Sequence, residues 1–236
     1  MAIGRAVHAL VVDGDDTLWE DTIYFERAIE RFVEGVAHAG HDPAHVRAVM
    51  DQVERQNVVR HGYGIPGFRH SLLDCFERLA GRPPDEAERR WLLALAQEIV
   101  DQPVALIDGV SETLGALGDR FPLILFTKGP AQEQARKVEG SGLAPLFSEI
   151  VITQEKSVDD YRRLIRLQAL RPAESWMVGN SPRSDVIPAL EAGLNAVFVP
   201  HSRTWTLEHA ELPSASDRLI VLERFGDLVS RFLSDR

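Results

Sequence analysis

Five short apolar runs define the framework of this chain. They occupy residues 9–12, 123–126, 150–152, 176–178 and 196–199. Several of them lack alternating polar residues, as parallel strands do when both faces of their sheet are covered. Helical patterns separate the later runs, at residues 111–117, 132–139, 159–170 and 184–192. Strands that alternate with helices predict a doubly wound α/β domain built on a parallel sheet.

The interval between the first two runs is about a hundred residues, far longer than an ordinary crossover connection. It contains four helical patterns and no good strand pattern, at residues 21–39, 43–59, 68–80 and 85–100. Pro43 and Pro84 suit helix starts, because proline is tolerated in the first turn. We therefore predict an α/β core from residues 1–19 and 106–236, interrupted by an all-helical domain at residues 20–105.

The composition is that of an ordinary globular protein, with 44% hydrophobic and 26% charged residues among 236. A formal net charge of −10 disfavours nucleic acid and anionic membranes as partners, because those surfaces attract basic proteins. No apolar stretch approaches the roughly 20 residues of a membrane span, and the N-terminal run meets acids instead of continuing as a secretory signal. Cys75 is the only cysteine, so an internal disulfide is excluded. These features predict a cytoplasmic protein.

Two carboxylates come directly after the first apolar run. Asp13 and Asp15 lie two positions apart, and Thr17 follows them. Side chains at i and i+2 of an extended chain point to the same side, so we expect both acids to face one spot, where a cation or a shared proton neutralises them. An aspartate can attack phosphorus, and a neighbouring acid can protonate the leaving oxygen. The alternative is a simple turn after a strand, because Asp and Gly favour turns.

Polar residues also follow the second run. Thr127, Lys128 and Gly129 offer a hydroxyl, a cation and a glycine that exposes backbone N–H groups, which together suit a phosphate. The same residues also suit an unremarkable loop. Only three of the 26 basic residues are lysines, at positions 128, 137 and 156, so each lysine is notable in this arginine-rich chain.

The third and fourth runs are followed by further candidates. Lys156 comes after the third run, where the alternative is an ordinary solvated lysine. Asn180 and Asp185 follow the fourth run, and their side-chain oxygens suit a hard cation, although Asp185 equally suits a helix cap. All of these clusters stand at the carboxyl ends of predicted strands, the edge at which open α/β sheets bind ligands.

Taken in order, these residues resemble the four motifs of the haloacid dehalogenase-like hydrolase superfamily. The motifs are Asp13-x-Asp15-x-Thr17, Thr127, Lys156 and Gly179-Asn180-x-x-x-x-Asp185. The resemblance covers about residues 7–200 and places the helical insertion where that superfamily carries its C1 cap. It implies a Rossmann-like core and a Mg²⁺-dependent phosphatase that hydrolyses a small phosphorylated metabolite through a phospho-aspartate intermediate.

The resemblance also implies a role for each residue. Asp13 resembles the nucleophile, and Asp15 resembles the acid that protonates the leaving group and later activates water. Thr127 would hydrogen-bond the phosphoryl oxygens, and Lys156 would stabilise both the nucleophile and the transferring group. The residues that would hold Mg²⁺ are Asp13, Asp15 through its backbone carbonyl, Asn180 and Asp185. Further candidates for phosphate contacts are Thr17, Lys128 and Gly129.

Three residues depart from the superfamily pattern. The fourth motif usually begins Gly-Asp, whereas Asn180 is neutral and should weaken a Mg²⁺ site. Lys128 takes a place often held by asparagine and adds a positive charge beside the phosphate. Gly14 replaces a bulky apolar residue, which predicts a looser nucleophile loop.

Other functions stay open at this point. A haloalkanoate dehalogenase needs neither a second acid nor Mg²⁺, so Asp15 and Asp185 argue against it. A phosphomutase shares Asp13 and Asp15 and is therefore an alternative. Asn180 and Gly14 favour a non-catalytic phosphate-binding or scaffold protein.

One segment is a candidate for substrate selectivity. Residues 60–69 are rich in glycine, and their Arg60, Tyr63 and Arg69 suit a second anionic or hydroxylated part of a substrate. The alternative is a polar connection between two helices. His201 and Trp205 follow the fifth run, and the sequence assigns them no role.

Overall fold

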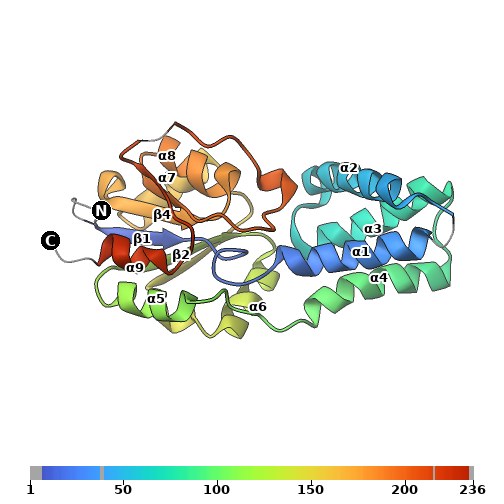
Figure 1. The fold of residues 1–236 in the computed structure, drawn as a ribbon, viewed down its shortest axis with the longest axis horizontal. Helices are drawn as coiled ribbons and strands as arrows, with labels where there is room; N and C mark the ends of the chain where they lie inside the picture. The colour runs from blue at the N-terminus through green and yellow to red at the C-terminus, as the bar shows by residue number, and fades with distance from the viewer. Residues whose placement is uncertain (1–6, 38–39, 215, 234–236) are drawn as a thin grey trace. The chain divides into compact units, whose positions relative to one another are not determined.

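The chain forms two compact units. The computed structural model describes residues 7–37, 40–214 and 216–233 (Figure 1). One unit contains residues 1–20 and 104–236, and the other is Asp21–Pro103. The predicted limits of the insertion, at residues 20 and 105, differ from these by one and two residues.

The first unit is built on a six-stranded, fully parallel sheet, which confirms the predicted α/β core. Its strands are β1 (Ala9–Val12), β2 (Leu123–Lys128), β3 (Glu149–Thr153), β4 (Ser175–Gly179), β5 (Asn195–Phe198) and β6 (Leu219–Val221). Their order across the sheet is β3-β2-β1-β4-β5-β6. The chain adds β2 and β3 on one side of β1 and then β4, β5 and β6 on the other, so the strand order reverses at β1. The sequence pattern does not predict β6, because a strand of three residues is too short to show a periodicity.

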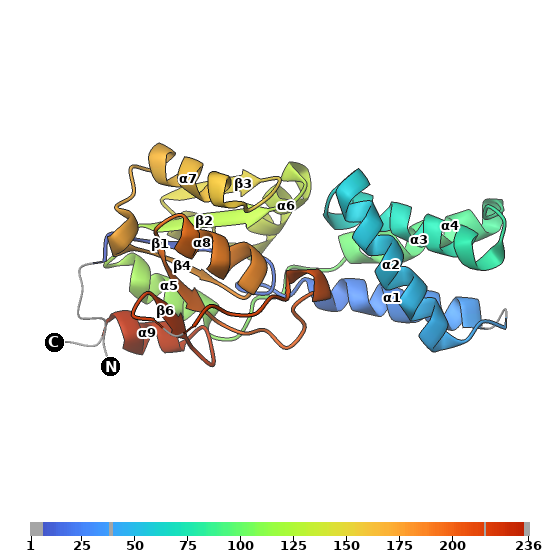
Figure 2. The ribbon, with the colours of Figure 1, turned by 90° about the horizontal axis from the view of Figure 1, so that it is seen from above.

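Helices cover both faces of this sheet (Figures 1 and 2). They are α5 (Val110–Gly118), α6 (Ala131–Ser141), α7 (Val158–Leu167), α8 (Ile187–Glu191) and α9 (Asp227–Phe232). The pleat of β1 turns Leu10 and Val12 toward one face, where they share a core with α5, α6 and α9. Ala9 and Val11 face the opposite way and share a core with α7 and α8. Burial on both faces explains why the apolar runs lack polar alternation.

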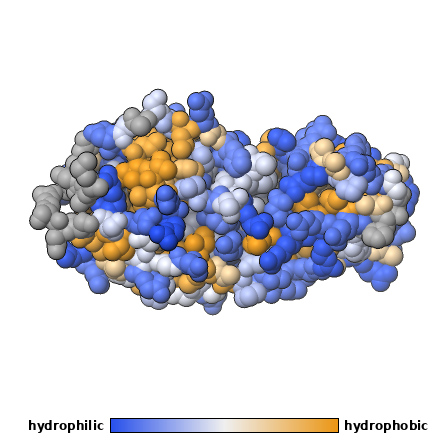
Figure 3. All heavy atoms as spheres, in the orientation of Figure 1, coloured by the Kyte–Doolittle hydropathy of each residue, from blue (hydrophilic) through white to orange (hydrophobic). Residues whose placement is uncertain are grey.

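The second unit consists of helices among its described residues. They are α1 (Thr22–Ala37), α2 (Pro43–His61), α3 (Gly64–Ala80) and α4 (Glu86–Val100). Asp42 and Asp85 cap the N-termini of α2 and α4 through their carboxylates, and apolar stripes of all four helices form one core. Mainly hydrophilic residues cover these helices on the face drawn in Figure 3. The predicted end of the first helix, at residues 38–39, lies outside the described residues. No described helix is long and apolar enough to cross a membrane.

The glycine-rich segment at residues 60–69 is mostly helical. α2 extends to His61 and α3 begins at Gly64, so the connection between the two helices is a tight turn. Gly62 has a φ of 77°, and a Cβ on Gly67 would lie 2.2 Å from the Gly62 carbonyl oxygen. The glycines therefore serve close helix packing. Arg69 donates to Gln97 Oε1 at 3.2 Å within this unit.

Candidate active site

The candidate site lies at the carboxyl ends of four adjacent strands. Asp13 follows β1, Thr127 is the next-to-last residue of β2, Lys156 follows β3, and Asn180 follows β4. These strands are neighbours in the order β3-β2-β1-β4, around the point where the strand order reverses. This is the position at which open α/β sheets bind ligands.

A buried lysine joins two buried carboxylates at this edge. Lys156 Nζ donates to Asp13 Oδ1 and, at 2.8 Å, to Asp185 Oδ1. The three residues are 3%, 7% and 1% exposed, respectively. Burial alone would lower the pKa of Lys156, but Asp13 and Asp185 outweigh it, and the pKa is raised. The ammonium therefore stays charged between the two acids.

Asp185 is placed by the loop after β4. The helix predicted at residues 184–192 begins earlier in the structure, with a π-helical turn over Pro182–Val186 that precedes α8. Ser181 N donates to Asp185 Oδ2 at 3.0 Å, and a Cβ on Gly179 would lie only 2.2 Å from that oxygen. Burial, and to a smaller extent the charge of Asp13, raises the pKa of Asp185 to about 7, although Lys156 lowers it. Gly179 is thus required for the observed position of the Asp185 carboxylate.

Thr17 holds the predicted nucleophile from its other side. Its hydroxyl donates to Asp13 Oδ2 at 2.9 Å and accepts from Asn180 N at 3.1 Å. Asn180 Nδ2 donates to Thr204 Oγ1 at 3.2 Å, which leaves its Oδ1 3.3 Å from the Thr17 hydroxyl. The sequence suggested Thr17 as a phosphate contact, whereas the structure gives its hydroxyl to Asp13 and to the Asn180 backbone.

These residues fit the Mg²⁺ that the motif resemblance implies. Asp13 and Asp185 place two buried carboxylates on a single ammonium. When both are ionised, one negative charge is left over among the three groups. Asn180 adds an amide oxygen to the same strand ends. Oxygen ligands with excess negative charge are what a hard divalent cation requires.

The second aspartate has different partners from the first. Asp15 forms an ion pair with Lys137, whose Nζ lies 3.0 Å from both carboxylate oxygens. Trp19 Nε1 donates to Oδ1 at 2.7 Å, and Gln134 Nε2 donates to Oδ2 at 2.8 Å. Burial would raise the pKa of Asp15, but Lys137 and the two other donors outweigh it and lower the pKa. The sequence predicted that both side chains face one spot, whereas in the structure each carboxylate is paired with a different lysine.

The turn after β1 explains this separation. Thr17 N and Leu18 N both donate to Gly14 O, and Asp16 has a φ of 58°, so the chain is no longer extended beyond Asp13. The i, i+2 rule for strands therefore does not apply to Asp13 and Asp15.

Gly14 makes room for an aromatic ring. A Cβ on Gly14 would lie 2.8 Å from Cζ2 of Trp19, and Trp19 is buried. The indole ring fills the space that a larger side chain at position 14 would need, and the same ring donates to Asp15. The predicted loose loop is thus a packed one.

The residues at the end of β2 have separate contacts. Thr127 Oγ1 donates to Gln134 Oε1 at 2.9 Å. Lys128 Nζ donates to Glu208 Oε1 at 2.5 Å and to Ser184 Oγ at 2.9 Å. Gly129 N donates to Thr153 O at 2.9 Å, so this amide is already used and does not support the predicted phosphate contact. The negative charge of Glu208 beside Lys128 was not foreseen from the sequence.

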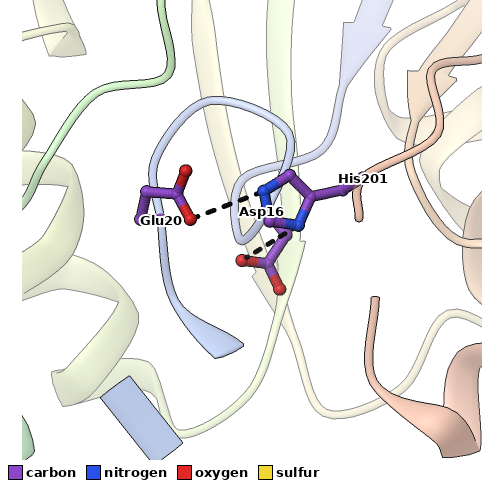
Figure 4. A group of neighbouring side chains, drawn as sticks. All are labelled: Asp16, Glu20 and His201. Atoms are coloured by element: carbon purple, nitrogen blue, oxygen red, sulfur yellow. Dashed lines mark ion pairs between the residues drawn. The ribbon is translucent and has the colours of Figure 1, made fainter. Parts of the chain in front are cut away.

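His201 brings two further carboxylates together (Figure 4). Its Nδ1 lies 3.8 Å from Asp16 Oδ1, and its Nε2 lies 3.4 Å from Glu20 Oε2. One ligand atom from each residue lies within 4.8 Å of the others, so the three form a group of potential metal ligands. The two ring nitrogens face different carboxylates, which is the arrangement of an imidazole that bridges two acids.

Sequence reasoning missed Gln134 and Lys137, which α6 brings to Asp15. The scarcity of lysine was the available signal for Lys137, since it is one of three. The spacing of three residues between Gln134 and Lys137 places them on one face of a helix, but it does not reveal what that face contacts.

Comparison with known proteins identifies the family. A sequence model of the haloacid dehalogenase-like hydrolases matches residues 7–193 of this chain. The chain belongs to the haloacid dehalogenase-like hydrolases. The match confirms the resemblance drawn from the four motifs, and with it a hydrolase built on a Rossmann-like core.

Similar proteins agree with this family. A solved structure of a haloacid dehalogenase-like family hydrolase from Xanthomonas campestris has a TM-score of 0.81 and 26% identity, and covers 96% of this chain and 95% of that one. Phosphoserine phosphatase of Thermus thermophilus is 34% identical over 118 residues, 48% of this chain and 44% of that protein. N-acylneuraminate-9-phosphatase of Mus musculus is 29% identical over 118 residues, 48% of either protein. The chain spans about half the length of these curated relatives. It is thus a haloacid dehalogenase-like hydrolase with relatives that are phosphatases.

Proposed function

We propose that this hydrolase is a Mg²⁺-dependent phosphatase that acts on a small phosphorylated metabolite through a phosphorylated Asp13. The observation that carries the proposal is the buried contact of Lys156 with both Asp13 and Asp185. Phosphoryl transfer requires a positioned nucleophile and positive charge around the phosphoryl group more than any elaborate covalent chemistry. The names of the curated relatives support the same reaction class.

In this mechanism one oxygen of Asp13 attacks phosphorus. The bond from phosphorus to the leaving oxygen breaks, and its electron pair stays on that oxygen. Asp15 is an ion-paired carboxylate of lowered pKa in the resting site, so it first takes up a proton from solvent. It transfers this proton to the leaving oxygen and becomes a carboxylate again. It then takes a proton from the water that attacks the phospho-aspartate, which releases phosphate and restores Asp13. Lys156 and Thr17 orient Asp13 through one carboxylate oxygen each.

Four residues would hold Mg²⁺: Asp13, Asp15 through its backbone carbonyl, Asn180 and Asp185. When bound, the ion supplies positive charge next to the phosphoryl oxygens. Thr127 would contact those oxygens through its hydroxyl, which in this structure donates to Gln134. Lys128 would act at longer range, because its ammonium is paired with Glu208.

The helical unit, Asp21–Pro103, is proposed to act as the cap of the enzyme and to exclude bulk water during turnover. A capped site suits a small metabolite and excludes folded protein or duplex nucleic acid as a substrate. The acidic net charge of −10 agrees with this and with a cytoplasmic enzyme that binds neither nucleic acid nor membranes.

A screen of phosphorylated metabolites for release of inorganic phosphate tests this function. We expect turnover with Mg²⁺, its loss on chelation, and its loss in Asp13→Asn with the fold retained, because an amide does not attack phosphorus. Isomerised sugar phosphate without free phosphate would identify a phosphomutase. Phosphate binding without any turnover would instead indicate a non-catalytic protein.

A further inference from the structure

Helix α6 sends two polar side chains to the same carboxylate. Gln134 and Lys137 are 2% and 6% exposed and lie three residues apart, so they share one face of the helix. Both contact Asp15, from which they are 119 and 122 residues away in the sequence. Neither residue belongs to the four motifs.

The contacts occupy both oxygens of Asp15. Oδ1 accepts from Trp19 Nε1 and from Lys137 Nζ, and Oδ2 accepts from Gln134 Nε2 and from Lys137 Nζ. An indole N–H and an ammonium can only donate. Gln134 is oriented by Thr127, whose hydroxyl donates to its Oε1 and leaves the amide N–H₂ for Asp15. The carboxylate is therefore fixed from three directions.

Asp15 itself lies in a loop, outside the named helices and strands. It lies within the turn, between Gly14 and Asp16, and its backbone forms an isolated bridge with Trp19. Displacement of a proton donor by about 1 Å is enough to lower a rate strongly. Lys137 and Gln134 thus hold the Asp15 carboxylate in place, a role that the motif residues do not have.

We propose that Lys137 and Gln134 are positioning residues that hold Asp15 where it serves the leaving group. This inference rests on the proposed function, because it assigns them to the proton-transfer step of that reaction. In that step Asp15, which has taken up a proton from solvent, loses it as its O–H bond breaks and the proton goes to the leaving oxygen. The carboxylate that results is bound again by Lys137 and Gln134. Lys137 acts only through Asp15 and does not touch the substrate.

The test compares kcat/KM for two phosphomonoesters with Mg²⁺ present. An alkyl phosphate needs a proton on its leaving oxygen, whereas p-nitrophenyl phosphate has a stable leaving group and needs little help. Lys137→Met should lower kcat/KM for the alkyl phosphate by about 10–100-fold and change that for the aryl phosphate by less than about threefold. Gln134→Leu should act in the same direction. Damage to the fold would lower both values together.

The matched control is Arg136→Met, which removes one positive charge from the adjacent, exposed position of α6. It should leave the ratio of the two kcat/KM values unchanged. A ratio that stays at the wild-type value in both Lys137→Met and Gln134→Leu would overturn the positioning role while the proposed function stands. The alkyl phosphate is one that the screen of phosphorylated metabolites shows to be hydrolysed. A wild-type protein that releases phosphate from no ester of that screen would overturn the proposed function, and the positioning role with it.

A second measurement does not depend on turnover. Trp19 Nε1 donates to Asp15, so the indole N–H resonance of Trp19, assigned with Trp19→Phe, reports the position of that carboxylate. Lys137→Met should shift this resonance, and Arg136→Met should not. An unmoved Trp19 resonance in a folded Lys137→Met protein would contradict the proposal directly.

Discussion

Glu54 provides a sharp test of the electrostatics of the helical unit. It lies in α2, is 9% exposed, and burial raises the pKa of its carboxyl to about 7 from an ordinary 4.5. Asp51 and Glu26 raise the pKa further, while Arg47 and Arg55 lower it. Arg47 lowers the pKa of Glu54 only in part, because its guanidinium is hydrogen-bonded to Glu26 and Asp51.

The sign of the effect follows from the raised pKa. Below about pH 4.5 Glu54 is protonated in both the folded and the unfolded chain, and the folded state carries no penalty from it. As the pH rises from 4.5 through 7, the unfolded chain ionises first, so stability is lost progressively. The full difference corresponds to about 3 kcal/mol of unfolding free energy at pH 8.

Glu54→Gln should therefore be close to the wild type in stability at pH 4.5 and more stable by about 3 kcal/mol at pH 8. Glutamine keeps the size and polarity of the side chain but cannot ionise. We expect a rise in Tm of about 6–12 °C at pH 8, measured by circular dichroism, with slower hydrogen exchange in α2. Glu30→Gln, the same change at an exposed position of α1, is the matched control.

Two results would refute this reasoning. Equal gains at pH 4.5 and pH 8 would mean that the effect does not come from ionisation. A loss of stability at pH 8 would mean that the Glu54 carboxylate is charged and favourably paired in the folded state.

Three further predictions concern the proposed active site. Gly179→Ala should displace the Asp185 carboxylate, whose Oδ2 would lie 2.2 Å from the new Cβ. We expect Mg²⁺ binding, measured by calorimetry, to weaken by roughly tenfold or more while the fold is retained. Asn180→Asp adds a carboxylate and should tighten Mg²⁺ binding; an identical titration for both forms would place Asn180 outside the ion's ligands. Lys156→Ala should lower kcat by about 100-fold or more, whereas Lys128→Ala should mainly raise KM, and the reverse order in steady-state kinetics would exchange their roles.

Much of the fold was predictable from local patterns. The apolar runs, the helical periodicities and the long interval after the first run are properties of neighbouring residues, and they gave the parallel sheet and the helical insertion. The order of the motif residues also placed Asp13, Thr127, Lys156 and Asn180 at strand ends, because parallel strands present their carboxyl ends at one edge. Short β6 and the helical character of residues 60–69 escaped these patterns.

The partners of the site residues depended on the tertiary structure. Asp15 is paired with Lys137 across 122 residues, and Lys128 is paired with Glu208 across 80. The direction of Asp15 follows from a turn at Gly14, and the ring of Trp19 occupies the space that the glycine leaves. The sequence alone determined which chemical groups stand at the sheet edge. Only the folded chain decided which cation each acid meets, because that choice depends on how α6 and the loops pack against the strand ends.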